Sequence, residues 1–196
     1  MPAGEQSSDG ELVAGLRRGD EQALGELYRR RRPSVYRFAL YLSGDPTLAE
    51  EAVQEAFLAL IRRPELFDER RGDVASYLLG IARNLVRRSR REPAAAQLTD
   101  AAPDGEPPDG GPDPLERLDR AERNEQVRQA VLSLPEPYRA TVALCDLEEL
   151  SYESAAAALD STVGAVRSRL HRGRQLLWRK LQALSQRKTS VTGEPR

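Results

Sequence analysis

The sequence is short of the residues that build catalytic and metal sites. Cys145 is the only cysteine and His171 the only histidine among 196 residues. A single cysteine cannot form a disulfide within the chain, and a single histidine excludes a multi-histidine metal site. The sequence contains no phosphate-binding glycine loop and no nucleophile paired with a histidine. We therefore expect a protein that is not an enzyme and that uses no metal and no cofactor.

Long apolar runs are missing as well. No run is long enough to span a bilayer and no signal peptide is visible, so we expect no membrane insertion and a cytoplasmic location. The net charge of −1 conceals blocks of charge. Residues 92–116 hold seven acids and no base, whereas residues 162–196 hold nine Lys/Arg and one acid. Such blocks favour nucleic acid as the partner of the basic parts and other partners elsewhere.

Residues 150–181 predict two helices joined by a tight turn. Ser151 can cap a short Ala-rich helix over residues 152–159, and Asp160 can take a left-handed conformation in the turn that follows. The next helix has apolar residues at intervals of three or four, which form one face. These residues are Val163, Val166, Leu170, Gly173, Leu177, Leu181 and Leu184. The other faces carry arginines, which is typical of a DNA recognition helix, although a solvated cationic face is the alternative.

Helical spacing also runs through the N-terminal half. It predicts helices over residues 11–18, 21–42, 47–63 and 74–91, with Pro33 bending or breaking the second. We expect Asp20, Asp45 and Asp73 to cap the last three. The third should bury Val53, Ala56, Phe57, Leu60 and Ile61, and the fourth Val74, Tyr77, Leu78, Ile81, Ala82 and Leu85. The exposed acidic stripe of the third helix is either a solvated face or a docking surface.

The expected fold is all-α, with two small helical domains over residues 9–91 and 114–184. A flexible acidic linker over 92–113 joins them, the second domain contains the helix-turn-helix, and 185–196 form a polar tail. A linker of this length spans roughly 25–30 Å as a random coil. Two domains joined in this way could reach DNA sites more than one helical turn apart.

These segments together resemble the extracytoplasmic-function (ECF) sigma factors of bacterial RNA polymerase, the small sigma-70 type with only the second and fourth sigma domains. The resemblance rests on GDEQALGELYRRRRPSVYRFAL, AEEAVQEAFLAL, YLLGIARNLVRRSRR and LPEPYRATVALCDLEELSYESAAAALDSTVGAVRSRLHRGR, in the family's order. It implies a factor that docks on core RNA polymerase, recognises the −35 and −10 promoter elements and directs transcription initiation. The implied partners are core polymerase, promoter DNA and an anti-sigma factor.

The resemblance also implies roles for matching residues. Docking on polymerase falls to Glu50, Glu51, Gln54 and Glu55. Recognition of the −10 element, including capture of an unpaired base, falls to Phe67, Arg70, Arg71, Tyr77, Asn84, Arg87, Arg88 and Arg91. Recognition of the −35 element in the major groove falls to Arg167, Ser168, Arg169, His171, Arg172 and Arg174.

Six positions depart from the family's pattern. Glu51 stands where Asp is common, Tyr77 where Trp is common, Arg88 where Asp is frequent, Ser154-Ala155 where Glu-Ile is usual, and Asp160 where Gly is usual. The change at 154–155 removes a capping-box acid and an apolar anchor. We expect it to cost the helix-turn-helix about 1 kcal/mol or more.

Three alternatives stay open at this point. An autonomous helix-turn-helix regulator with a protein-binding N-terminal half accounts equally well for the C-terminal third, but not for AEEAVQEAF followed by IARN and an arginine run. Asn84 could help to end or pack its helix instead of pairing with a base. Part of the arginine run could stabilise the helix C-terminus through the macrodipole instead of holding phosphates.

Overall fold

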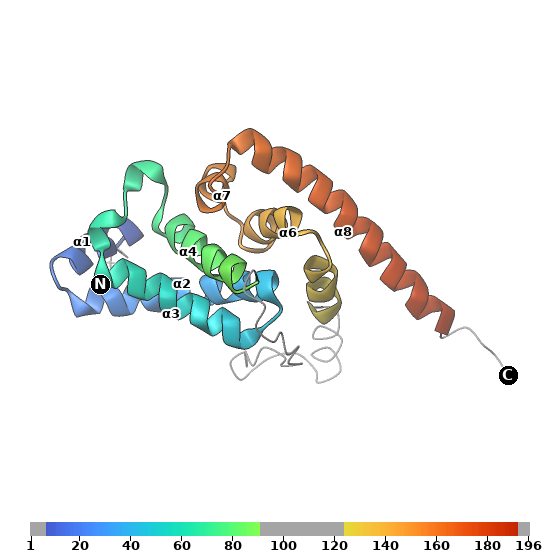
Figure 1. The fold of residues 1–196 in the computed structure, drawn as a ribbon, viewed down its shortest axis with the longest axis horizontal. Coiled ribbons are helices and arrows are strands. Elements are labelled where there is room, and N and C mark those ends of the chain that lie inside the picture. Colours follow the sequence, from blue (N-terminus) through green and yellow to red (C-terminus); the bar gives the residue numbers. More distant parts are fainter. Residues whose placement is uncertain (1–6, 91–123, 192–196) are drawn as a thin grey trace, which may run out of the picture.

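The computed structural model describes residues 7–90 and 124–191, with side chains through residue 183. Within these ranges every regular element is helical, as predicted. The first half contains α1 (Asp9–Arg17), α2 (Glu21–Ser43), α3 (Pro46–Arg62), two 3-10 turns (Pro64–Leu66 and Glu69–Arg71) and α4 (Val74–Ser89). The second half contains a helix over 124–132, α6 (Glu136–Val142), a π-helical turn (Ala143–Leu147), α7 (Tyr152–Leu159) and α8 (Val163–Val191) (Figure 1).

Four helices begin where a capping residue predicts them. The side chains of Asp20, Asp45, Asp73 and Ser151 each accept a hydrogen bond from a backbone N–H in the first turn of α2, α3, α4 and α7. Ser8 adds a cap that the sequence reading overlooked, since it forms a reciprocal capping box with Glu11 and starts α1 earlier than expected. The expected break at Pro33 is wrong, because α2 is continuous through it.

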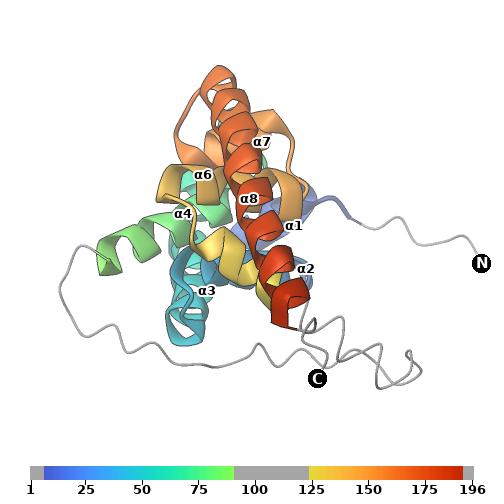
Figure 2. The same ribbon diagram turned by 90° about the vertical axis from the view of Figure 1, so that its right-hand side faces the viewer.

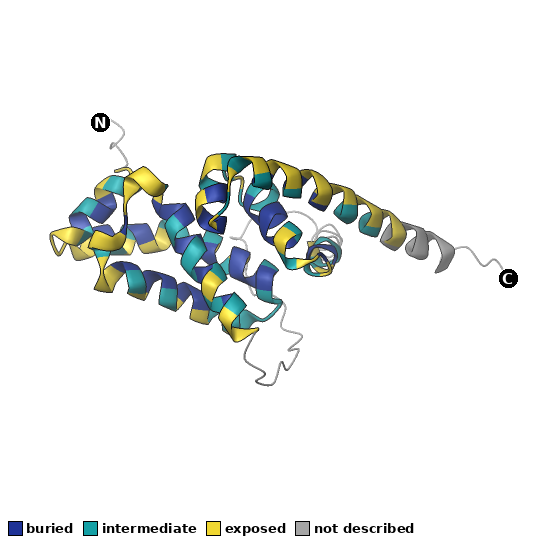
Figure 3. Ribbon diagram, turned by 45° about the horizontal axis from the view of Figure 1, so that its top comes forward, coloured by how far each residue is buried: buried dark blue, intermediate teal, exposed yellow. Residues whose placement is uncertain are grey.

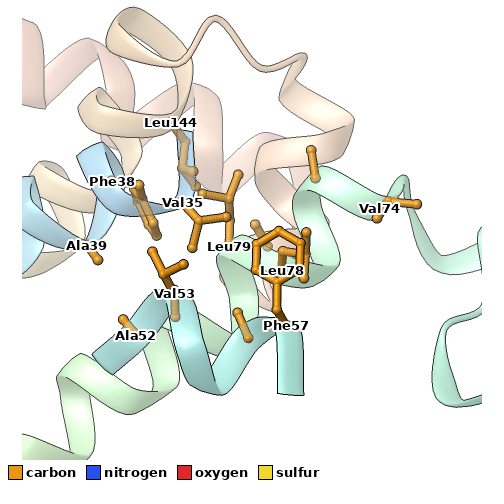
Figure 4. Packing of buried hydrophobic residues seen from close by; sticks show 14 of the residues in the cluster. Val35, Phe38, Ala39, Ala52, Val53, Phe57, Val74, Leu78, Leu79 and Leu144 are labelled. Atoms are coloured by element: carbon orange, nitrogen blue, oxygen red, sulfur yellow. The ribbon is translucent and has the colours of Figure 1, made fainter. Parts of the chain in front are cut away.

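Helices α2, α3 and α4 enclose the main core. Phe38 of α2, Val53 and Phe57 of α3, and Leu78 and Leu79 of α4 point toward one another (Figure 4). Each of these side chains is 3 % exposed or less. Burial of several large apolar side chains, each worth about 1.5–3 kcal/mol, is what holds these three helices together.

Two expectations about buried faces need correction. Ile61 is 40 % exposed and not part of the core. In α4 the fully buried residues include Leu79 and Val86, whereas Tyr77, Ile81 and Leu85 are only half-buried. The reason is that α4 packs against α2 and α3 on one side and against α7 on another, so that its buried surface is wider than one amphipathic stripe.

In the second half, α8 packs along α6. Val166, Leu170 and Gly173 of α8 are buried, while Val163 and Leu177 are half-buried, so the predicted face is the packed one. A Cβ at Gly173 would lie 2.8 Å from Val142 Cγ2, so glycine allows α6 its close approach. Residues 185–191 of the predicted tail continue α8 as helix. No described helix is long and apolar enough to cross a membrane.

The two halves share one continuous core, which the sequence did not predict. Leu144, Ala155, Leu159 and Val166 of the second half belong to the same buried cluster as the side chains of α1–α4. In Figure 1, α7 lies beside α4, and α8 extends away from the other helices. Figure 2, turned by 90°, shows α8 crossing the front of the molecule. The linker predicted over 92–113, together with the proposed start of the second domain at 114, lies outside the described residues.

Candidate nucleic-acid interface

The outer side of α8 presents four of the six residues predicted to read DNA. Arg167, Ser168, His171 and Arg172 are all exposed. Figure 3 shows exposed residues repeating along the coloured part of α8. The Arg167 guanidinium lies 5.6 Å from the centre of the Tyr152 ring, which orients it without burying it. The turn before α8 has the predicted form, because Asp160 adopts a left-handed conformation with φ 48°.

The other two arginines of the predicted −35 set already have partners within the protein. Arg169 is half-buried and donates to Ser161 Oγ at 3.2 Å. Arg174 makes a bidentate pair with Asp146, at 2.5 and 3.0 Å for its shortest hydrogen bonds. Hydrogen bonding to this carboxylate raises the pKa of Arg174 above its usual value. Arg169 is thus held within the protein, whereas Arg174 stays exposed but is already paired with Asp146.

A cavity of about 770 Å³ lies between α4 and the helix-turn-helix. One wall comes from the loop before α4 and from α4 itself, including Arg71, Tyr77, Asn84 and Arg87. The opposite wall comes from residues 156–161 and Arg169. Residues predicted to hold the −10 element thus share one cavity with part of the predicted −35 reader.

The two aromatic residues that line this cavity differ in how far they are exposed to solvent. Phe67 is 3 % exposed and packs edge-on against Tyr77, with ring centroids 5.6 Å apart. The ring of Phe67 therefore cannot touch DNA in this structure, and it instead supports Tyr77, which is half-buried. Burial raises the pKa of Tyr77, with a smaller contribution from Glu65, so its phenol stays neutral and can donate a hydrogen bond.

Polar residues of the predicted −10 set are more accessible. Arg70, Arg71, Asn84 and Arg88 are exposed, and Arg87 is half-buried. Arg91 lies outside the described residues. Asn84 stands on the side of α4 that lines the cavity, which is consistent with base pairing and leaves the packing alternative without support from burial.

Two arginines of the predicted phosphate-binding run have structural partners instead. Arg83 donates to the carbonyl oxygen of Leu159 at 3.2 Å and lies 3.6 Å from Glu136. Burial lowers the pKa of Arg83 from its usual value. Arg90 donates to the carbonyl oxygen of Ser43 at the end of α2. The sequence shows five arginines between positions 83 and 91, and only the tertiary contacts show that Arg83 and Arg90 donate to backbone carbonyls.

The acidic side of α3 is open, with one exception. Glu51 and Gln54 are exposed and Glu55 is half-buried, whereas Glu50 pairs with Arg32 at 2.7 Å. Two apolar residues extend the same side, since Leu58 and Ile61 follow at helical spacing and are 39 % and 40 % exposed. The sequence reading missed Leu58 as part of this surface, although its spacing from Glu51 and Gln54 would have revealed it.

Comparison with known proteins identifies the family. The Sigma-70 region 2 family matches residues 27–95 and the Sigma-70, region 4 family matches residues 124–177. The ECF RNA polymerase sigma-E factor of Escherichia coli strain K12 is 36 % identical over 199 residues, covering 93 % of this chain and 99 % of that relative. The chain belongs to the ECF sigma factors. It is thus a transcription initiation factor of the sigma-70 family and not the autonomous regulator considered above.

A second relative agrees with this assignment, and two solved structures share the fold. The ECF RNA polymerase sigma factor SigE of Mycolicibacterium smegmatis is also 36 % identical, over 81 % of this chain, but the match spans only 63 % of that relative's length. CnrH, solved with the cytosolic domain of CnrY, has the same fold, with a TM-score of 0.67, 24 % identity and coverage of 90 % and 99 % of the two chains. The sigma factor RpoE of Bartonella quintana, solved with the anti-sigma factor NepR, gives a TM-score of 0.59 at 22 % identity, over 81 % and 96 % of the two chains.

Proposed function

We propose that this ECF sigma factor uses three surfaces for its three tasks. The outer side of α8 reads the −35 element, the loop before α4 and α4 itself hold the melted −10 strand, and the outer side of α3 docks on core polymerase. The observation that carries the proposal is that each surface combines exposed charged or polar side chains with a helix whose opposite face is buried in the core.

For the −35 element, Arg167 and Arg172 are the base-reading or phosphate-binding residues. An arginine can bind guanine bidentately in the major groove, and such a pair contributes about 1–3 kcal/mol of discrimination. Ser168 and His171 lie between them on the exposed side. Arg169 and Arg174, with partners inside the protein, contribute less unless those partners are released.

For the −10 element, Asn84 pairs with the edge of a base that has left the stack. Its amide offers both a donor and an acceptor, and unstacking a base costs a few kcal/mol that such contacts must offset. Tyr77 supplies a ring beside it, held in place by Phe67. Arg71, Arg87 and Arg88 bind neighbouring phosphates, a contribution that falls as the salt concentration rises.

For polymerase, Glu51, Gln54 and Glu55 make the polar contacts. Leu58 and Ile61 add apolar surface to the same face, which strengthens its interpretation as a docking surface over that of a solvated acidic face, because solvated faces rarely carry adjacent exposed Leu and Ile. An anti-sigma factor is the third partner that we propose, on the ground of family membership.

The decisive experiment is run-off transcription with core polymerase, on a duplex promoter and on the same promoter pre-melted at the −10 element. Asn84→Ala should weaken binding of the exposed −10 strand and change the base preference at one position, with affinity for core polymerase retained. The matched control is Ser89→Ala, an exposed change near the end of α4. Unchanged binding and base preference of Asn84→Ala on the pre-melted template would remove the proposed role of this residue.

A further inference from the structure

We propose that Arg17, the last residue of α1, is a positioning residue for the −10 site. It holds the loop between α3 and α4 in the conformation in which that loop meets DNA. This inference rests on the −10 site proposed above and deepens it. It adds a residue on a helix, Asp9–Arg17, that carries none of the residues predicted to bind DNA.

The guanidinium of Arg17 joins the two ends of the first 3-10 turn of this loop. Its Nε and Nη2 atoms each donate to the carbonyl oxygen of Pro64 at 3.2 Å, and Nη2 also donates to the carbonyl oxygen of Phe67 at 2.7 Å. Pro64 begins the turn, and Phe67 directly follows it. A planar guanidinium has several donors in fixed directions, so it can hold two carbonyls at a set separation. The three bonds therefore fix the shape of the turn.

The loop has little regular structure to fix that shape by itself. Residues 63–73 contain two 3-10 turns of three residues each, at Pro64–Leu66 and Glu69–Arg71. Turns of this kind have poorer hydrogen-bond geometry than α-helices. Phe67 is 3 % exposed and anchors the middle of the loop. Burial of one ring fixes a point but not the path of the backbone on either side, and the directional bonds from Arg17 supply that path.

Helix α1 is a firm base for this contact, because its other end is fixed to α2. Asp9 forms ion pairs with Arg30 and Arg31 of α2. Between the two ends, Val13 is 1 % exposed and belongs to the main core. Arg17 thus extends from a helix that is already held by charge and by apolar burial. A loop that is ordered in advance in this way loses less conformational entropy when it binds a ligand.

Phe67 transmits the effect of Arg17 to the residues that meet DNA. Its carbonyl oxygen accepts from Arg17, while its ring packs edge-on against Tyr77. The next residue, Asp68, accepts a hydrogen bond from the backbone N–H of Arg70 at 3.0 Å and so sets the second turn, where the Arg70 side chain is exposed. Without the contact from Arg17, both the support of Tyr77 and the start of the arginine turn would shift.

The test compares two substitutions at Arg17 with a control at its neighbour. Arg17→Ala removes the contact, and Arg17→Lys keeps the charge but replaces the planar fork by a single ammonium group. Arg18→Ala is the matched control, because Arg18 is also exposed and its side chain forms no hydrogen bond or ion pair within residues 7–90 and 124–183. Each alanine variant removes one positive charge from the same end of α1, so a difference between them reports the contacts of Arg17.

The first measurement is hydrogen exchange on the full-length chain without DNA. Amides of residues 63–73 should exchange on the order of tenfold faster in Arg17→Ala than in the parent, because local opening becomes easier once the three bonds are lost. Exchange in the buried parts of α2, α3 and α4 should stay unchanged, which shows that the fold is kept. Arg18→Ala should behave as the parent throughout.

The second measurement is binding of a single-stranded −10 oligonucleotide to the full-length chain assembled with core polymerase. A loop that takes the binding conformation one fifth of the time binds about fivefold more weakly, and we expect a loss of this size for Arg17→Ala, with weaker discrimination among bases at the captured position. Arg17→Lys should recover only part of the loss. Affinity for a −35 duplex should not change. The salt dependence of −10 binding should equal that of the parent, because no phosphate contact is removed.

Full recovery by Arg17→Lys, or a lower salt dependence of Arg17→Ala, would overturn positioning and show that Arg17 meets the phosphates directly. Unchanged exchange of residues 63–73 would overturn the hold on the loop. Equal −10 binding and base preference of Arg17→Ala and the parent would remove Arg17 from the −10 site, while a loss in Asn84→Ala would leave the site itself standing. Failure of the site would instead appear as an unaltered Asn84→Ala.

Discussion

Arginines occur in two contrasting environments in this protein. Some lie on the outer side of α8, and others lie between the two halves. Arg167 and Arg172 extend into solvent from a helix whose back is packed. Arg139, by contrast, is 8 % exposed and donates to the carbonyl oxygens of Leu134 and Leu42. Burial lowers the pKa of Arg139 to about 10, which still leaves it charged near neutral pH.

The difference shows that a basic pattern predicts cations but not their partners. Exposed guanidinium groups keep their donors free for phosphates and bases. Buried ones use their donors on backbone carbonyls at helix ends, where an unpaired carbonyl would be costly. In this protein the second use connects the halves, and the first is left for DNA.

The largest expected effect concerns the buried arginine, Arg139. Arg139→Ala should lower the free energy of unfolding by about 2–4 kcal/mol, because it removes charge-assisted hydrogen bonds and leaves carbonyl acceptors unpaired in a buried site. Urea unfolding followed by circular dichroism measures this. The matched control, Arg63→Ala at an exposed position, should change the unfolding free energy by no more than about 0.5 kcal/mol. Equal effects of the two changes would mean that Arg139 is not a structural arginine.

The second prediction compares two arginines of α8, one open to solvent and one paired with Asp146. Arg172→Ala should weaken binding of a −35 duplex by about 1–3 kcal/mol, with unfolding unchanged. Arg174→Ala, which removes the partner of Asp146, should weaken binding of the −35 duplex less. Fluorescence anisotropy at two salt concentrations measures the affinity of each variant and its salt dependence, which falls when a phosphate contact is lost. A larger loss for Arg174→Ala would show that the pair with Asp146 opens when DNA binds.

The smallest effect concerns the carboxylate that joins the two halves. Because the pKa of Asp73 is lowered in the folded protein, its ionised form stabilises the fold above the unfolded pKa, and this contribution is lost as the pH falls through the folded pKa. Asp73→Asn keeps a good N-cap and should therefore be less stable than the parent by up to about 1 kcal/mol at pH 6, a modest value since the group is exposed. The stability difference between the parent and Asp73→Asn should shrink below pH 3.8, the ordinary pKa of an Asp side chain. Urea unfolding at a series of pH values measures it. A difference that stays constant down to pH 2 would contradict the assignment.

Much of the fold followed from local patterns. Asp20, Asp45, Asp73 and Ser151 mark helix starts because a short polar side chain satisfies backbone N–H groups within its own turn. The bounds of α7 and the left-handed Asp160 follow for the same local reason. The outer residues of α8 were predictable because their packed face repeats at helical spacing.

Errors arose where residues distant in sequence decide the environment. Ile61 fits the apolar spacing of α3 but stays exposed, because no element within residues 7–90 and 124–183 covers that end of the helix face. Leu79 and Val86 are buried because α4 is packed on more than one side. Ser154, which the sequence marks only as a lost capping acid, gains a partner in Asp73, 81 residues away.

The sequence by itself determined the helices, their caps, the family and the set of charged residues available for DNA and polymerase, because each depends on neighbours within a few residues. Only the tertiary structure decided which arginines face solvent, which carboxylate of α3 is already paired, and that α7 packs against α4. Those outcomes depend on burial and on directional contacts between the halves. Such contacts form only when helices far apart in the chain are packed together, so no local pattern encodes them.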